Sequence, residues 1–142
     1  MHQGTCLCGA IKYAVDDNLQ FVVNCHCRFC RKEHGASFAT LLLMPFLKFE
    51  IVQGKESIAS YEVETIGAVR CFCSRCGTRL YNYSPARGMI SLMVATLDGD
   101  PDIHPLANIN TGSKCSWFEI NDGLPRFSAI PTQDEFARLL SH

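Results

Sequence analysis

The chain has 142 residues, of which 47% are hydrophobic, and these values are typical of one globular domain with a sizeable core. Its 13 basic and 14 acidic residues give a formal net charge of -1, which argues against partners attracted by bulk charge, such as nucleic acids or anionic membranes. No apolar run is long enough to cross a bilayer as a helix, so we expect no membrane span.

The first residues lack the basic start and the apolar segment of a secretory signal peptide, so we expect a cytoplasmic protein. A reducing cytoplasm disfavours disulfides, and an odd number of cysteines, 9, argues against a closed disulfide framework. The cysteines therefore point to metal or redox chemistry.

Most of the predicted elements are short strands. Ile11, Tyr13 and Val15 alternate with Lys12 and Ala14, which is the period of a half-buried strand, and turn residues separate the later runs. We expect strands, in chain order, at 11–15, 21–23, 37–44, 46–52, 57–63, 68–71, 78–83, 89–97, 106–109 and 117–120.

Only two short helices are predicted. The first covers 28–34 and ends at Gly35, a residue suited to the left-handed conformation that closes a helix. The second begins at Thr132, which forms a capping box with Glu135, and continues through Leu140. With no linker or low-complexity segment, the sequence predicts a single domain over 1–142, mainly β with little helix.

Eight of the 9 cysteines fall into three clusters, and the spacing Cys-x-Cys-x-x-Cys occurs in two of them. A Cys-x-x-Cys pair turns the backbone so that both sulfurs face one ion, and Gly77 after the last cysteine permits that tight backbone. The pattern favours zinc over an iron–sulfur or redox role.

Two incomplete groups combine into a closed site with the four sulfurs of Cys6, Cys8, Cys73 and Cys76. Three thiols then remain, at Cys25, Cys27 and Cys30. Three protein ligands with an open position is the layout of a catalytic zinc, whereas structural zinc sites are closed. Either Cys71 or Cys115 could instead complete the second site and make it inert.

Four segments of the chain together carry a resemblance to a known family: GTCLCGAIKY at 4–13, CHCRFCR at 25–31, FCSRCG at 72–77 and WFEINDGLP at 117–125. They resemble the glutathione-dependent formaldehyde-activating enzyme family, which also contains centromere protein V. The resemblance covers nearly the whole chain and implies an Mss4-like (β-tent) fold of antiparallel sheets. It implies a structural zinc at the four cysteines and a catalytic zinc at the three, in agreement with the pairing reached by counting.

The activity that this resemblance implies is that of a carbon–sulfur lyase, which reversibly forms S-(hydroxymethyl)glutathione from glutathione and formaldehyde. Three thiolates around Zn²⁺ leave a net negative site, a poor Lewis acid for water but suited to a substrate thiol that attacks an aldehyde. Arg28, Arg31 and Lys32 could offset that charge and hold glutathione's carboxylates, and Arg31 is our candidate for substrate contact.

A competing hypothesis is a non-enzymatic binding module in which both zinc sites are structural. Between two predicted ligands, His26 is expected to point away from the metal or to face solvent, with ligation or a proton-shuttle role as alternatives. Tyr81 and Tyr83 are interpreted as packing residues of a sheet, and the single tryptophan, Trp117, as a core residue, with a pocket-lining role as the alternative. The physiological thiol, the aldehyde and the oligomeric state are left open by the sequence.

Overall fold

The computed structural model describes residues 1–141, which form ten strands and two α-helices together with short 3-10 turns. The prediction of a mainly β protein with little helix is confirmed. The chain divides into two discontinuous compact units, the first made of Met1–Leu19 with Leu42–Asp102, and the second of Gln20–Leu41 with the chain from Ile103 onward. Strand β4 (Ala39–Pro45) contains the boundary between them.

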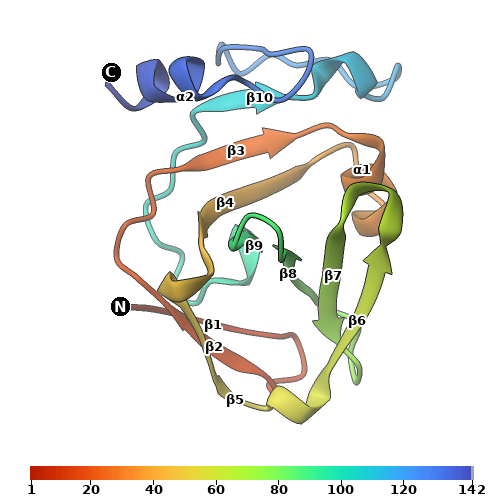
Figure 1. Ribbon diagram of the computed structural model, residues 1–142, viewed down its shortest axis with the longest axis vertical. Helices are drawn as coiled ribbons and strands as arrows, with labels where there is room; N and C mark the ends of the chain where they lie inside the picture. Colours follow the sequence, from red (N-terminus) through yellow and green to blue (C-terminus); the bar gives the residue numbers. More distant parts are fainter. Residues whose placement is uncertain (142) are drawn as a thin grey trace. The chain divides into compact units, whose positions relative to one another are not determined.

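A three-stranded antiparallel sheet in the first unit has the order β1-β2-β5, with β1 at His2–Thr5, β2 at Lys12–Val15 and β5 at Phe49–Gln53 (Figure 1). Tyr13 and Val15 are fully buried and Lys12 is exposed, as the alternation predicts. Strand β1 is short and polar and was not predicted. A Cβ on Gly4 would lie 2.0 Å from Tyr13 Cζ, so β1 packs against this ring only because a glycine stands there.

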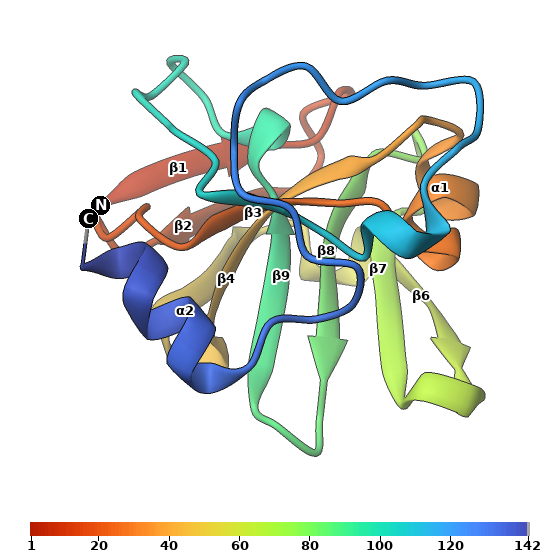
Figure 2. The same cartoon turned by 90° about the horizontal axis from the view of Figure 1, so that it is seen from above.

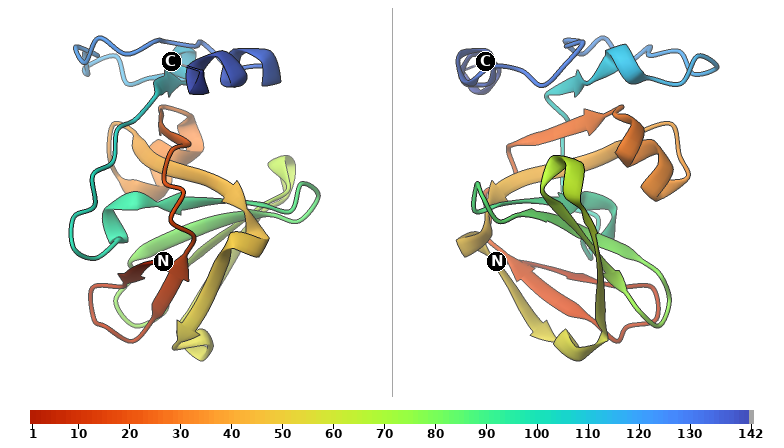
Figure 3. Two further views of the ribbon diagram at one scale, coloured as in Figure 1. Left: turned by 90° about the vertical axis from the view of Figure 1, so that its left-hand side faces the viewer. Right: turned by 45° about the vertical axis from the view of Figure 1, so that its right-hand side comes forward.

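Four consecutive strands in the same unit form an antiparallel meander, which Figure 3 shows from two sides. They are β6 (Ile58–Val63), β7 (Ala68–Cys73), β8 (Arg79–Ser84) and β9 (Met89–Met93). Tyr81 packs on Phe49 and Tyr83 on Phe46, each with ring centroids 4.7 Å apart, so the two tyrosines are packing residues as predicted. One-turn 3-10 segments lie at Phe46–Lys48, Lys55–Ser57, Glu64–Ile66, Val94–Thr96 and Thr111–Ser113.

The second unit holds β3 (Val22–Cys25) and β10 (Ala107–Ile109), which run parallel and side by side (Figure 2). Both predicted helices are present, as α1 (Arg28–His34) and α2 (Gln133–Leu140). Gly35 closes α1 with a φ of 61°, and the capping box of Thr132 and Glu135 opens α2. No helix in residues 1–141 is both long and apolar enough to cross a membrane.

The strand predicted at 117–120 is wrong, because that segment is a turn followed by irregular chain. Side chains bind two of its carbonyl groups in place of a neighbouring strand, since Lys114 Nζ donates to the Phe118 carbonyl at 2.8 Å and Arg126 Nη2 donates to the Ile120 carbonyl. Trp117 is 74% exposed and is therefore a surface residue, which corrects its assignment to the core.

Candidate metal centres

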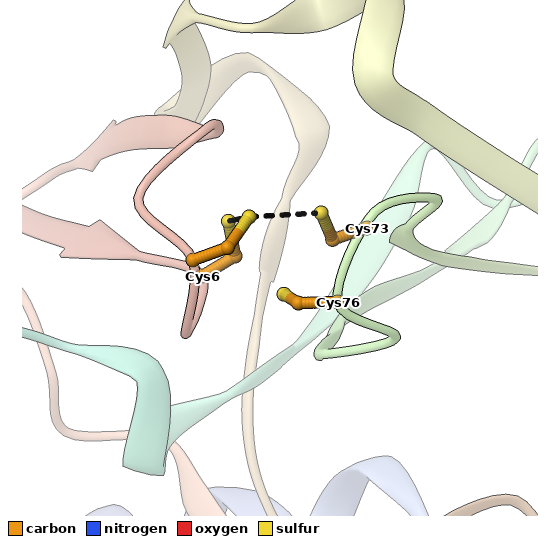
Figure 4. Close-up of side chains that lie close together, drawn as sticks. Cys6, Cys73 and Cys76 are labelled. Atoms are coloured by element: carbon orange, nitrogen blue, oxygen red, sulfur yellow. Dashed lines mark hydrogen bonds between the residues drawn. The ribbon is translucent and has the colours of Figure 1, made fainter.

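Four cysteines gather in the first unit, two from the loop after β1 and two from the end of β7 and the turn that follows it (Figure 4). The ligand atoms of Cys6, Cys8, Cys73 and Cys76 all lie within 4.8 Å of one another. The Sγ atom of Cys8 is 3.7 Å from that of Cys6 and 3.8 Å from that of Cys73.

These separations distinguish a metal site from a disulfide. Tetrahedral zinc with Zn–S bonds of about 2.3 Å holds its sulfurs about 3.8 Å apart, whereas a disulfide needs about 2.05 Å. None of the nine cysteines, all within the described residues, forms a disulfide. The four-thiol cluster thus has the donor set and the spacing that a tetrahedral thiolate-bound metal requires.

Thr78 joins the two halves of the four-thiol cluster. Its hydroxyl accepts a hydrogen bond from the Leu7 backbone N–H at 3.0 Å and lies 3.1 Å from Cys76 Sγ. The hydrogen bond from this hydroxyl, helped by the Thr78 backbone, lowers the pKa of Cys76 to about 5. On the other side, the Ile11 N–H donates to Cys6 Sγ at 3.2 Å. These donors favour the thiolate form that binds metals.

Three cysteines gather in the second unit around the start of α1, and the ligand atoms of Cys25, Cys27 and Cys30 also lie within 4.8 Å of one another. Cys25 and Cys30 are buried, and Cys27 is half-buried. Cys27 is the N-cap of α1, and its Sγ accepts a hydrogen bond from the Cys30 N–H at 3.3 Å. Sequence reasoning missed this role because serine, threonine, aspartate and asparagine are the usual N-caps.

The three thiols of this cluster differ in the direction of their pKa shifts. Hydrogen bonds from the thiols of Cys25 and then Cys30 lower the pKa of Cys27, and backbone N–H groups add to the effect. The hydrogen bond with Cys27 raises the pKa of Cys25, and the hydrogen bonds with Cys25 and then Cys27 raise the pKa of Cys30. Of the three thiols, Cys27 is therefore the one whose thiolate form its neighbours favour.

Neither of the two remaining cysteines belongs to a metal-ligand cluster of residues 1–141. Cys115 is buried in the second unit. Cys71 lies on β7 in the first unit, where burial and then the Cys71 thiol raise the pKa of Tyr81. The three-thiol cluster therefore has no fourth cysteine, histidine or carboxylate among the described side chains.

Two buried polar residues, His26 and Asn108, are linked by a side-chain contact that the sequence does not predict. His26 is fully buried, and its Nε2 lies 2.9 Å from Asn108 Oδ1. Asn108 Nδ2 donates to both carboxylate oxygens of Asp122, at 3.1 and 3.0 Å, so the amide oxygen faces the ring and His26 Nε2 carries the hydrogen. Phe38 and Phe118 pack on the ring at centroid distances of 5.0 and 6.3 Å. The expectation that His26 faces solvent is corrected.

The turn after β10 contacts the site at two points. Arg31 Nη1 donates to the Ser113 carbonyl oxygen at 2.7 Å, and Asn110 Nδ2 donates to Cys25 Sγ at 3.4 Å. Arg31 is half-buried, while Arg28 and Lys32 are exposed on the same helix. The predicted substrate contact of Arg31 stays a prediction, and its guanidinium is already held against the 3-10 turn.

Asp122 gives this region a predictable response to pH. The Asn108 amide and the Leu124 N–H lower the pKa of its carboxyl, although partial burial opposes them. A lowered folded-state pKa adds stability above the ordinary carboxyl pKa, and this stability disappears as the pH falls through the lowered value. Asp122→Asn should therefore lower the melting temperature at pH 7, and the difference from the parent should shrink on acidification.

Thermal unfolding at a series of pH values tests this expectation, with Glu62→Gln on exposed β6 as the matched charge-removing control. A deficit for Asp122→Asn that is the same at every pH would show that the carboxylate charge plays no part.

Comparison with known proteins places these clusters in a family. The sequence model of the family described as "Glutathione-dependent formaldehyde-activating enzyme" matches residues 1–113. A Halomonas elongata protein that carries this name provisionally is 28% identical over 125 residues, which cover 83% of this chain and 80% of that protein. A crystal structure of a Rhodobacter sphaeroides protein superposes with a TM-score of 0.60 at 22% identity, covers 88% of this chain and 98% of that one, and supports the fold alone. Because the family model spans most of the sequence, the chain belongs to the glutathione-dependent formaldehyde-activating enzyme family.

Proposed function

We propose that the protein is a zinc-dependent carbon–sulfur lyase that forms or cleaves an S-hydroxymethyl adduct of a thiol, with glutathione and formaldehyde as its substrates. Family membership and the name of the Halomonas relative support this choice of substrates. The observation that carries the proposal is the difference between the two clusters, because one gathers four sulfurs and the other only three. A closed set suits a structural zinc, and an open set suits a catalytic one.

In this reaction the thiol sulfur of the substrate forms a bond to the aldehyde carbon, and the thiol proton ends on the former carbonyl oxygen. Zinc held by Cys25, Cys27 and Cys30 would supply the positive charge that keeps a substrate sulfur deprotonated and nucleophilic. Among these thiols only Cys27 is half-buried, so we assign the substrate side of the cluster to Cys27. The Cys30 N–H holds the Cys27 sulfur in place.

Binding of an anionic thiol also needs compensating positive charge. The three basic residues of α1 are the nearest such groups along the chain, and the last turn of this helix contains Arg31 and Lys32. Arg31 Nη1 is held by the Ser113 carbonyl, and its buried Nε has no partner among the described residues. We assign Arg31 to a glutathione carboxylate, because a guanidinium whose orientation is already fixed loses little freedom on binding.

The free thiols also bear on the cellular location and on the number of zinc ions. Seven free sulfurs in two clusters require a reducing compartment, so we propose a cytoplasmic location. We also propose that residues 1–142 act as one domain, with one structural zinc and one catalytic zinc that chelators remove more easily.

Exchange between glutathione and ¹³C-formaldehyde, followed by NMR with and without the protein, tests the activity because a catalyst raises the exchange rate without changing the equilibrium. We expect two zinc ions per chain and accelerated exchange with glutathione, but none with S-methylglutathione, which lacks the thiol. A protein that binds two zinc ions but does not accelerate exchange with any thiol would instead be a binding module with two structural sites.

A further inference from the structure

We propose that Asn110 is a positioning residue of the three-thiol cluster, whose side-chain N–H holds the Cys25 sulfur and strengthens metal binding there. This inference rests on the proposed function only in taking the cluster as a metal site. Its carrying observation is the contact from Asn110 Nδ2 to Cys25 Sγ at 3.4 Å. Cys25 is only 5% exposed, so water supplies little of the hydrogen bonding that an anionic sulfur needs.

The backbone around Asn110 is fixed from both sides. Its N–H donates to the Ala129 carbonyl at 3.2 Å, and its own carbonyl accepts from the Ser113 N–H at 3.0 Å. Just before it, Ile109 pairs with Cys25 across the parallel strands β3 and β10, and the His26 N–H donates to the Ile109 carbonyl at 3.0 Å. The pairing of β3 with β10 therefore places the Asn110 amide next to the Cys25 sulfur.

The conformation of Asn110 is compatible with this role for its side chain. With a φ of 56° it lies in the left-handed region, which glycine adopts freely and asparagine tolerates better than most residues. Among the described residues, Asp100 with a φ of 47° is the other non-glycine in this region. Asparagine therefore satisfies the backbone of this turn and also supplies the amide that contacts Cys25 Sγ.

The chemistry of an amide donor also suits this position. Three thiolates around Zn²⁺ leave an excess negative charge, and a neutral N–H withdraws electron density from one sulfur without occupying a coordination position. A lysine or arginine could supply charge, but its longer side chain would have to fold into a half-buried turn. Asn110 supplies a short donor at the end of β10.

Asn110→Gly removes the amide and keeps the backbone conformation, which glycine adopts freely, so we expect the variant to fold. Loss of a partner to a metal ligand costs about 10-fold or more in affinity. We expect the second zinc of the full-length protein to bind about 10-fold more weakly in competition with a chromophoric chelator. The first zinc, at the four-thiol cluster, should bind unchanged.

Asp100→Gly is the matched control, because it makes the same relief of a left-handed backbone in the other unit. It should leave both zinc affinities unchanged. If Asn110→Gly also leaves the second zinc affinity unchanged, Asn110 serves only the turn and the inference is overturned.

Cobalt(II) substitution gives a second readout that a purely structural role would not move. A hydrogen bond lowers the energy of the sulfur lone pairs, so its removal should shift the sulfur-to-cobalt charge-transfer band of the second site to longer wavelength. An unchanged band would contradict the inference. Both readouts are independent of turnover, so a parent protein without lyase activity would end the proposed function and leave this inference tested on its own.

Discussion

Replacement of Cys73 by serine is expected to abolish cooperative folding of the first unit and the binding of the structural zinc that we propose at the four-thiol cluster. Cys73 is fully buried at the end of β7, and its sulfur lies 3.8 Å from that of Cys8, which is 65 residues away in the chain. Structural zinc contributes about 10–16 kcal/mol of apparent binding free energy in zinc-finger peptides, whereas whole domains are stable by only about 5–15 kcal/mol. Loss of one ligand from a closed set should therefore outweigh the remaining stability.

Cys71→Ser is the matched control, because Cys71 lies on the same strand and is also buried. Burial of its hydroxyl should cost about 1–3 kcal/mol and leave the zinc content unchanged. Circular dichroism during thermal unfolding, together with zinc analysis of the purified proteins, measures both variants. If the two lose similar stability and both retain zinc, the four-thiol cluster is not a structural metal site.

Replacement of Cys27 by serine is expected to leave the protein folded, remove the second zinc and reduce thiol–aldehyde exchange by at least about 100-fold. Partners of metal ligands alone are worth about 10–100-fold in affinity or activity, so a ligand should be worth more. Serine is also a strong helix N-cap, so α1 should keep the backbone hydrogen bond that Cys27 now accepts from Cys30. Fold and metal binding are thereby separated in one variant.

The control for this experiment is Cys115→Ser, which changes a cysteine of the same unit that belongs to neither cluster. It should retain two zinc ions and near-parent exchange rates. A Cys27→Ser protein that unfolds as completely as Cys73→Ser would make the second site structural. A folded Cys27→Ser protein with parent activity would exclude the three-thiol cluster from the chemistry.

Much of the fold could be predicted because its signals are local. The alternation around Tyr13, the glycine after α1 and the capping box at Thr132 each act within a few residues. The segment 117–120 failed because its aromatic residues suggest a strand, whereas Lys114 satisfies the nearby carbonyls. A side chain takes the hydrogen-bonding place of a neighbouring strand here, and this depends on the tertiary structure.

In the candidate site, too, the local features could be predicted from the sequence and the long-range contacts could not. The cysteine spacings are visible because zinc ligands come in short sequence pairs, and the structure brings together the two predicted sets. The surrounding donors were not predicted, because the contacts of Asn108 with His26 and of Asn110 with Cys25 span 82 and 85 residues. One signal was available, since Asn108 is an amide in the middle of a buried three-residue strand. A buried amide requires partners.

The residues of the two clusters become available at different times during synthesis, because the second unit is discontinuous in the chain. Synthesis proceeds from the N-terminus, so the four-thiol cluster has all its ligands once Cys76 has emerged. The three-thiol cluster has its sulfurs earlier but lacks Asn108 and Asn110 until β10 is made. Contacts of such long sequence separation form late, because closing the loop costs entropy before it returns any contact. A nascent chain thus contains the thiols of Cys25, Cys27 and Cys30 before β10 can supply the contact from Asn110 to Cys25.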